Sequence, residues 1–397
     1  MAVKQSLFDF YNSSADFSTD RDRNEIIDVL RAYSAKGPIV SKDLGAEHGY
    51  LLVLMGCDGG HWTVRRFKSG LVSLDITQIE NKKGEVKMSG QILKNLCQSL
   101  KDKLYSKKSR ILPPVIRDGP FDPYLNSSDG RIIEYDIDSV VVDEDSDFQN
   151  IKILHSKSYG NILVLDDDVN LAESDIAYTE AITGQGRENY KDKTVLILGG
   201  GDGGILHELL KQDPKQVIML KVIDLNDAFD SVTLSCLLRD YDMIVTIIMI
   251  PSLQQQVLNM LHIDKLVIDY SKKYLRGICG DSLDSLKGSN YEVIIGDCVK
   301  VLNEYIENGI MFDYVINDLT AIPITTHPKG STWDFLRHIL NLSMKVLLPK
   351  GNYFTQGNGA TKKDSLQMYE DQLSKLECPV EFNKYSVSVP SYLEMYP

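Results

Sequence analysis

Apolar side chains recur at helical and strand-like intervals in the first section of the chain, residues 1–112. Helical spacing occurs over Ile26–Tyr33 and Ile92–Leu104, and strand-like runs lie between them at Tyr50–Met55 and Trp62–Leu74. This pattern predicts a small α+β domain. Because the section contains no recognisable catalytic motif, we interpret it as a packing or dimerisation domain.

A second section, residues 113–190, begins at a double proline and shows shorter strand-like runs. The runs are Arg131–Tyr135, Gln149–Ser156 and Asn161–Leu165. Acidic residues cluster over Glu134–Asp147, where the alternatives are a solvated rim and a cavity mouth that attracts cations. We therefore expect a small β-rich section between the first domain and a third.

The third section, residues 191–397, has the pattern of an α/β domain. Thr194–Leu198 is an apolar, strand-like run, the loop Gly199–Gly204 follows it, and Ile205–Lys211 has helical spacing. A glycine-rich loop between a strand and a helix is typical of a Rossmann-like parallel sheet with helices on its faces. This is the domain in which we expect a ligand.

The glycine loop also indicates the kind of ligand. Gly199, Gly201 and Gly204 match the GxGxxG spacing that lets a backbone approach a nucleotide. Asp202 in the same loop would repel a pyrophosphate by about 1 kcal/mol or more, which disfavours a dinucleotide. A nucleoside that carries a positive charge, such as a sulfonium, suits this loop better.

Carboxylates follow three of the predicted strands. Asp202 follows the first, Asp297 and Cys298 follow another, and Asp318 ends a third. Since ligands of such sheets bind beyond the carboxyl ends of the strands, we expect the three carboxylates in one crevice; the alternative for each is a helix cap. Three carboxylates suit a polyamine. Because an amine attacks carbon only when it is neutral, Asp318 is the candidate general base.

Composition and charge narrow the function classes. The 397 residues include 43 Lys and Arg against 56 Asp and Glu, a net charge of −13, which disfavours nucleic acid and anionic membranes as partners. The six cysteines form no CxxC pair, so neither a zinc site nor a disulfide framework is indicated. The longest apolar run, Met243–Ile250, is too short to span a bilayer, and the N-terminus lacks an apolar signal core. We expect a cytoplasmic protein.

Several motifs resemble the polyamine aminopropyltransferases, and they are GGGDGGILHEL, YEVIIGDC and FDYVINDLTAIPI. Four further segments are more similar to the spermine synthases of animals than to spermidine synthases: Glu134–Asp138, Gln149–Ser156, Asp168–Tyr178 and Pro390–Glu394. The likeness covers nearly the whole chain. It implies a Rossmann-like catalytic domain of the methyltransferase type, after an N-terminal domain that resembles S-adenosylmethionine decarboxylase and makes a homodimer.

The resemblance also implies a reaction, which is transfer of an aminopropyl group from decarboxylated S-adenosylmethionine to spermidine, with no cofactor and no metal. By motif position Asp318 is the proton acceptor. The residues expected at the donor are Gln149, Gly199, Gly201, Asp264, Asp297 and Cys298. The residues expected at spermidine are Tyr178, Asp202, Tyr392 and Glu394.

The chain departs from the family pattern at a 41-residue segment, residues 222–262, which interrupts the turn between a strand and the next helix. The family glutamate that binds the donor ribose has no counterpart; Lys221 or His262 takes its place, and Asp224 is a possible substitute. We interpret the segment as a retained intron or a faulty gene model.

A second departure is the end at Pro397, where the family continues through a further strand. The two departures leave two alternatives to a working spermine-forming enzyme. One is a weak or inactive isoform that acts only through dimerisation, and the other is a spermidine synthase.

Overall fold

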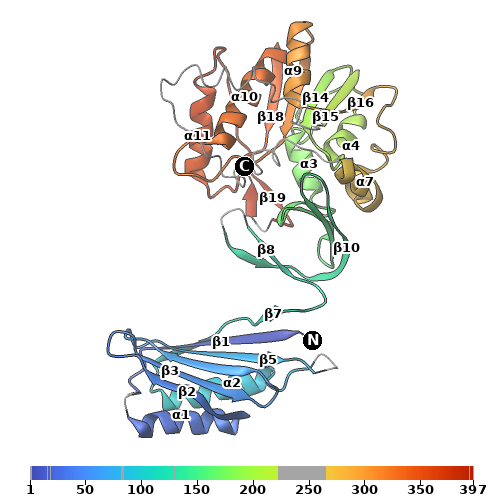
Figure 1. Ribbon diagram of the computed structural model, residues 1–397. Helices are drawn as coiled ribbons and strands as arrows, with labels where there is room; N and C mark the ends of the chain where they lie inside the picture. The colour runs from blue at the N-terminus through green and yellow to red at the C-terminus, as the bar shows by residue number, and fades with distance from the viewer. Residues whose placement is uncertain are drawn as a thin grey trace. The chain divides into compact units, whose positions relative to one another are not determined.

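The computed structural model describes residues 2–15, 17, 19–81, 85–127, 130–221, 265–392 and 394–396. The chain forms two compact units, Met1–Asp122 and Pro123–Pro397 (Figure 1). The interrupting segment 222–262, with Asp224, and the predicted donor residue Asp264 lie outside the described residues.

The first unit is built on an antiparallel sheet of strand order β2-β3-β4-β5-β1-β6, with β7 also paired to β1. Its strands are β1 (Val3–Tyr11), β2 (Ala35–Asp43), β3 (Tyr50–Gly56), β4 (His61–Arg66), β5 (Val72–Ile79), β6 (Lys108–Ile111) and β7 (Val115–Arg117). The single strand predicted over Trp62–Leu74 is wrong. The chain reverses there into β4 and β5, because Gly70 has a φ of +82° and the Phe67 amide donates to the Leu71 carbonyl across the turn.

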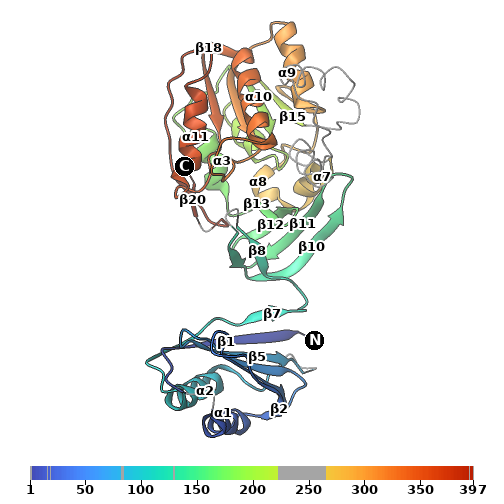
Figure 2. The same ribbon diagram turned by 60° about the vertical axis from the view of Figure 1, so that its left-hand side comes forward.

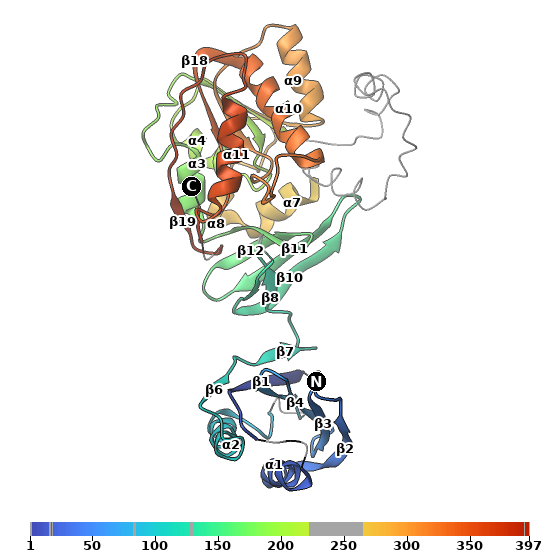
Figure 3. The same ribbon diagram turned by 90° about the vertical axis from the view of Figure 1, so that its left-hand side faces the viewer.

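Two helices, α1 (Asp20–Ala32) and α2 (Gly90–Lys103), cover one face of this sheet (Figure 3). Every second strand residue points toward them, and Phe8, Leu54 and Trp62 are among those that build the core. Intervening residues such as Val53 lie on the opposite face and are only partly buried. The predicted α+β fold of this section is confirmed, and none of its described helices covers the second face.

The second unit begins with a small, mostly antiparallel sheet of order β10-β11-β12-β13-β8-β9. Its strands are β8 (Tyr124–Asn126), β9 (Ile132–Glu134), β10 (Ile137–Asp145), β11 (Asn150–Ser156), β12 (Gly160–Leu165) and β13 (Asp168–Ala172). Ile151 and Ile153 of β11 pack against Val267 of α7 (Lys265–Tyr274), which joins this sheet to the following α/β layer. The predicted β-rich section is present.

A five-stranded parallel sheet of order β16-β15-β14-β17-β18 forms the centre of the second unit. Its strands are β14 (Thr194–Gly199), β15 (Gln216–Lys221), β16 (Tyr291–Ile295), β17 (Phe312–Asp318) and β18 (Leu347–Thr355). Successive residues of β14 point to opposite faces, with Val195 and Ile197 in one core and Leu196 and Leu198 in the other. Both faces are therefore apolar and need helices to cover them.

Helices cover both faces of this sheet (Figure 2). The first face carries α3 (Ile176–Ile182), α4 (Gly204–Leu210), α7 and α8 (Arg276–Cys279), and the second carries α9 (Cys298–Glu307) and α10 (Ser331–Val346). A further helix, α11 (Lys363–Leu373), packs on α10, and the hairpin β19 (Val387–Val389) with β20 (Glu394–Tyr396) returns to α3. The predicted Rossmann-like α/β fold is confirmed. In the described part of the chain no helix combines the length and apolarity that a membrane span requires.

Candidate active site

The site lies where the strand order of the parallel sheet reverses. Strands β15 and β16 follow β14 on one side, whereas β17 lies on its other side, so a crevice opens at the carboxyl ends of β14 and β17. Gly199 at the end of β14 pairs with Asp318 at the end of β17. Gly199 has a φ of +93°, and a Cβ there would come within 2.3 Å of the Asp318 carbonyl oxygen. A glycine is therefore required for the two strand ends to meet.

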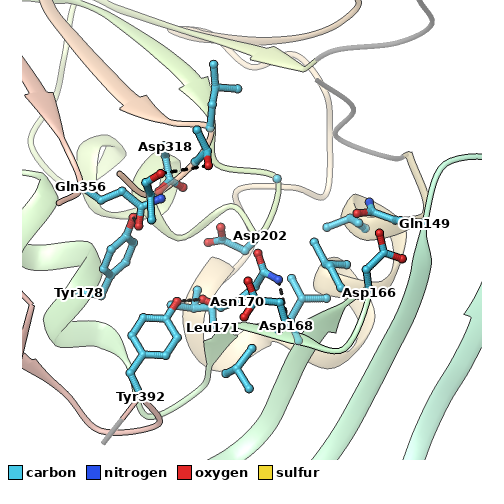
Figure 4. A pocket seen from close by; sticks show the side chains of 18 of the residues that line it. Gln149, Asp166, Asp168, Asn170, Leu171, Tyr178, Asp202, Asp318, Gln356 and Tyr392 are labelled. Atoms are coloured by element: carbon cyan, nitrogen blue, oxygen red, sulfur yellow. Dashed lines mark hydrogen bonds between the residues drawn. The ribbon is translucent and has the colours of Figure 1, made fainter. Parts of the chain in front are cut away.

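A cavity of about 580 Å³ occupies this crevice and extends to the small sheet of the same unit, which β8 to β13 form (Figure 4). It brings together six of the residues expected from the sequence, which are Gln149, Tyr178, Gly201, Asp202, Asp318 and Tyr392. Gly199, Asp297 and Cys298 are not among its lining residues. The side chain of Glu394 and the whole of Asp264 lie outside what the structure describes.

Asp318 is held at the end of β17 by a tyrosine from α3. The Tyr178 hydroxyl donates a hydrogen bond to Asp318 Oδ1 and lies 3.1 Å from Gln356 Oε1. Burial, with the neighbouring Asp202 carboxylate, raises the pKa of Asp318 to about 8, although the bond from Tyr178 acts in the opposite direction. With this pKa, Asp318 binds a proton near neutral pH.

Asp202 lies in the glycine loop, between β14 and α4. Its Oδ1 accepts a hydrogen bond of 2.8 Å from the Gly204 amide, which fixes the loop and the direction of the carboxylate. Burial raises the pKa of this group as well. Two partly buried carboxylates in one cavity repel each other when both are ionised, so the arrangement favours a cationic ligand.

Asp297 is not among the residues that line this cavity, and the expectation that it shares the crevice with Asp202 and Asp318 stays a prediction. It is the N-cap of α9, and its side chain accepts hydrogen bonds from the amides of Val299 at 2.8 Å and Lys300 at 3.5 Å. Cys298 is fully buried in the core behind the sheet, and burial raises the pKa of its thiol to about 12. Their contact with a donor stays a prediction.

The cavity also contains residues that the sequence analysis did not select. Tyr135, Asp166 and Asp168 come from the antiparallel sheet and its β12–β13 turn, and burial raises the pKa of Asp168. A signal was available, because three aspartates in succession, Asp166 to Asp168, follow a predicted strand. Figure 4 shows Asp202 between Asp318 and Asp168, so carboxylates line the cavity along its length.

Across the described ranges no group of three or more His, Cys, Asp or Glu side chains is placed to hold a metal ion. The absence of a metal or cofactor from the reaction remains a prediction.

Two family models match the second unit. The spermine/spermidine synthase domain matches residues 175–396, which is more than half of the chain, and the spermidine synthase tetramerisation domain matches residues 123–173. The second match covers the small sheet that β8 to β13 form. It does not include residues 1–112, in which we place the predicted dimer contact.

The relatives with similar sequences include both spermine synthases and spermidine synthases. The chain is 40% identical over 114 residues to spermine synthase SPE4 of Saccharomyces cerevisiae, and 33% identical over 113 residues to spermidine synthase of Schizosaccharomyces pombe. Each match covers 28% of this chain and 38% of the relative's length. A crystal structure of spermidine synthase from Thermotoga maritima aligns with a TM-score of 0.47 at 18% identity, over 69% of this chain and 76% of that one.

Proposed function

The chain belongs to the spermine/spermidine synthase family, and we propose that it transfers an aminopropyl group from decarboxylated S-adenosylmethionine to spermidine, giving spermine and methylthioadenosine. The observation that carries the proposal is the pair of partly buried carboxylates, Asp202 and Asp318, which share one cavity with Tyr178 at the carboxyl ends of the parallel sheet.

The donor fits the half of the cavity beside the glycine loop. Gly200 and Gly201 line it there, which allows a nucleoside to lie against the backbone. Gln149 contributes an amide nitrogen, Nε2, that is buried and has no hydrogen-bond partner among the described residues. A buried donor of this kind is costly unless a ligand accepts from it, so Gln149 supports a polar ligand such as a nucleoside.

Asp318 supplies the proton acceptor. When the sulfonium and the ammonium groups enter, their positive charges lower the pKa of Asp318 from its raised value and favour the carboxylate. Tyr178 occupies Oδ1, so Oδ2 is the oxygen that takes the proton from the attacking ammonium. The neutral nitrogen then forms a bond to the carbon next to sulfur, the carbon–sulfur bond breaks, and its electron pair stays on the sulfur of methylthioadenosine.

The acceptor half supports spermidine over a shorter diamine. Beyond Asp202 the cavity continues to Asp168, Tyr135 and Tyr392, where a further carboxylate lies among aromatic side chains. Spermidine has one more ammonium group than putrescine, and Asp168 provides a charge for it. If the acceptor were putrescine, this carboxylate would have no ligand charge to bind.

The test uses purified protein with decarboxylated S-adenosylmethionine and either spermidine or putrescine, with products separated by chromatography. We expect spermine from spermidine and at least a 10-fold lower rate with putrescine. A faster reaction with putrescine supports a spermidine synthase. No product from either amine, in a folded protein, supports the inactive isoform.

For assembly and location we propose a homodimer through the uncovered face of the first sheet, in the cytoplasm. The described cysteines Cys57, Cys97, Cys279, Cys298 and Cys378 are free thiols, which agrees with a reducing compartment. Sedimentation of the whole protein tests the dimer, and imaging of the tagged chain tests the location.

A further inference from the structure

Asp175 stands directly before α3, in the position where an aspartate usually accepts a hydrogen bond from the first amides of its own helix. Its side chain makes no such bond. The carboxylate is fully buried and turns toward residues outside the helix. Since an N-cap contributes about 1 kcal/mol, this orientation must be compensated by other contacts.

Those contacts fix Ser391, which lies 216 residues away in the sequence. Asp175 Oδ1 accepts from the Ser391 amide at 3.0 Å, and Oδ2 accepts from the Ser391 hydroxyl and from the Ala172 amide at 2.7 Å. The Tyr135 hydroxyl donates to the Ser391 carbonyl at 2.8 Å. All three polar groups of Ser391 are therefore bound, and a buried serine with this set of partners has one orientation.

The next residue is Tyr392, which lines the cavity beside Tyr178 (Figure 4). Its hydroxyl donates to the carbonyl of Asn170, on the strand β13 that also starts with Asp168. Asp175 itself is not among the cavity-lining residues. Its side chain reaches the acceptor half of the cavity through Ser391, whereas its backbone carbonyl accepts a hydrogen bond of 2.9 Å from the Tyr178 amide and does not depend on the carboxylate.

We propose that Asp175 is a positioning residue for the acceptor amine, because its carboxylate fixes the segment that places Tyr392 in the cavity. The inference rests on the proposed function for its kinetic effect, whereas the contact with Ser391 is independent of that function. Asp175 touches neither the donor half nor Asp318, so its loss should weaken binding of the acceptor selectively.

Asp175→Asn tests the role with little change in volume. The new amide group presents N–H donors to the donors of Ser391 and Ala172, so at least one of these bonds is lost. We expect the KM for spermidine to rise at least 10-fold, with the KM for the donor changed less than 2-fold and kcat at saturating spermidine near that of the unchanged protein. Ser391→Ala, which removes only the hydroxyl bond, should raise the KM for spermidine about 3-fold.

The matched control is Asp364→Asn, which changes an exposed aspartate in the first turn of α11 and should leave both KM values unchanged. Equal rises in both KM values, or a fall in kcat alone, would overturn the positioning role. So would an unchanged KM for spermidine.

Hydrogen exchange separates this inference from the proposed function. The Ser391 amide should exchange at least 10-fold faster in Asp175→Asn, with or without substrates, because the one oxygen of Asn is best placed where two donors meet at Oδ2, which leaves its N–H2 group facing the Ser391 amide. Unchanged protection at Ser391 rejects the positioning role even if the enzyme is active. Protein that turns over neither amine, yet shows the faster exchange in the variant, rejects the proposed function and keeps the contact.

Discussion

The two main sheets of the molecule differ in strand direction, and this difference decides where chemistry can occur. In the antiparallel sheet of the first unit, consecutive strands end at opposite edges, so the polar residues that follow them are spread over both edges. In the parallel sheet of the second unit, all strands end at one edge, which brings Asp202 and Asp318 together. A parallel sheet therefore concentrates charged groups that an antiparallel sheet disperses.

The two sheets also differ in the pKa of the carboxylates that they carry. Asp75 lies on the uncovered face of the first sheet, where partial burial and the neighbouring Asp9 raise its pKa. Asp318 lies in a cavity beside the Asp202 carboxylate, and desolvation together with that neighbour raises its pKa to about 8. The first sheet thus has a carboxylate at its surface, whereas the second retains one at a cost in stability, which is consistent with the catalytic role proposed for Asp318.

The largest expected effect is a loss of turnover when the aspartate of the parallel sheet, but not that of the first sheet, is replaced. Asp318→Asn should lower turnover about 100-fold or more, the scale of a lost general base, because the amide cannot accept the proton from the ammonium group. Steady-state rates with saturating donor and spermidine measure this. Asp75→Asn on the first sheet is the matched control, and its turnover should stay within 2-fold of the unchanged protein. Equal losses in both variants would contradict the assignment of Asp318.

The next expected effect is on folding stability: Asp318→Asn should lower turnover but raise the free energy of unfolding. An aspartate has a pKa near 3.9 in an unfolded chain, whereas folded Asp318 titrates at about 8, so the folded state binds the additional proton between these values. The stability of the ligand-free protein therefore falls as pH rises from about 4 to about 8. Asp318→Asn removes this titration, so the gain in stability should be greater at pH 8 than at pH 5, by about 4 kcal/mol at most.

Thermal or urea unfolding of the ligand-free protein at both pH values provides the measurement. Asp75→Asn should give a smaller gain, since its carboxylate is less buried. A destabilised Asp318→Asn variant at pH 8 would show that this carboxylate is favourably paired in the folded state.

A smaller effect is expected from Asp202→Asn. The amide keeps its acceptor for the Gly204 amide but loses the negative charge that faces the cavity. The KM for spermidine should rise about 10-fold, in line with the loss of one charge-assisted contact of roughly 1.5 kcal/mol. Initial rates at varied spermidine and fixed donor measure it. An unchanged KM would place the amine away from the glycine loop.

The smallest effect belongs to the first sheet. Val53→Ser puts a hydroxyl on the uncovered face and should weaken self-association at least 5-fold, because about 1 kcal/mol of apolar burial is lost. Sedimentation over a dilution series measures the dissociation constant. Val64→Ser, on the helix-covered face of the neighbouring strand, should lower folding stability instead. If Val53→Ser leaves association unchanged, the dimer contact lies elsewhere.

Much of this architecture is predictable from short-range patterns. The strand, glycine loop and helix around Asp202 and the strand ending at Asp318 are recognisable, since buried strands and glycine turns have local signatures. The roles of Asp175 and Asp297 are not predictable in this way. Both precede a helix, but Asp297 caps α9 whereas Asp175 binds Ser391, and the choice depends on which partner the distant chain supplies.

Residues from the antiparallel sheet were missed for a related reason. Asp168 begins the short strand β13 and Tyr135 lies between β9 and β10, and the direction of both side chains depends on how this sheet packs against α7. Local spacing gives the alternation of side chains but not the face that meets the cavity. The interval between Tyr135 and the residue it binds, Ser391, is 256 residues, and no local pattern reports a contact of that length.

The bonds from Asp175 and Tyr135 to Ser391 also set an order of assembly. During synthesis the glycine loop and Asp318 emerge before Ser391, so the parallel sheet can form while the acceptor wall is still absent. Closing a loop of this length costs chain entropy before the contact returns any energy, and such contacts form late. If the proposed function holds, the newly made protein acquires the half of the cavity beside the glycine loop first, and its acceptor half is complete only when Ser391 reaches Asp175 and Tyr135.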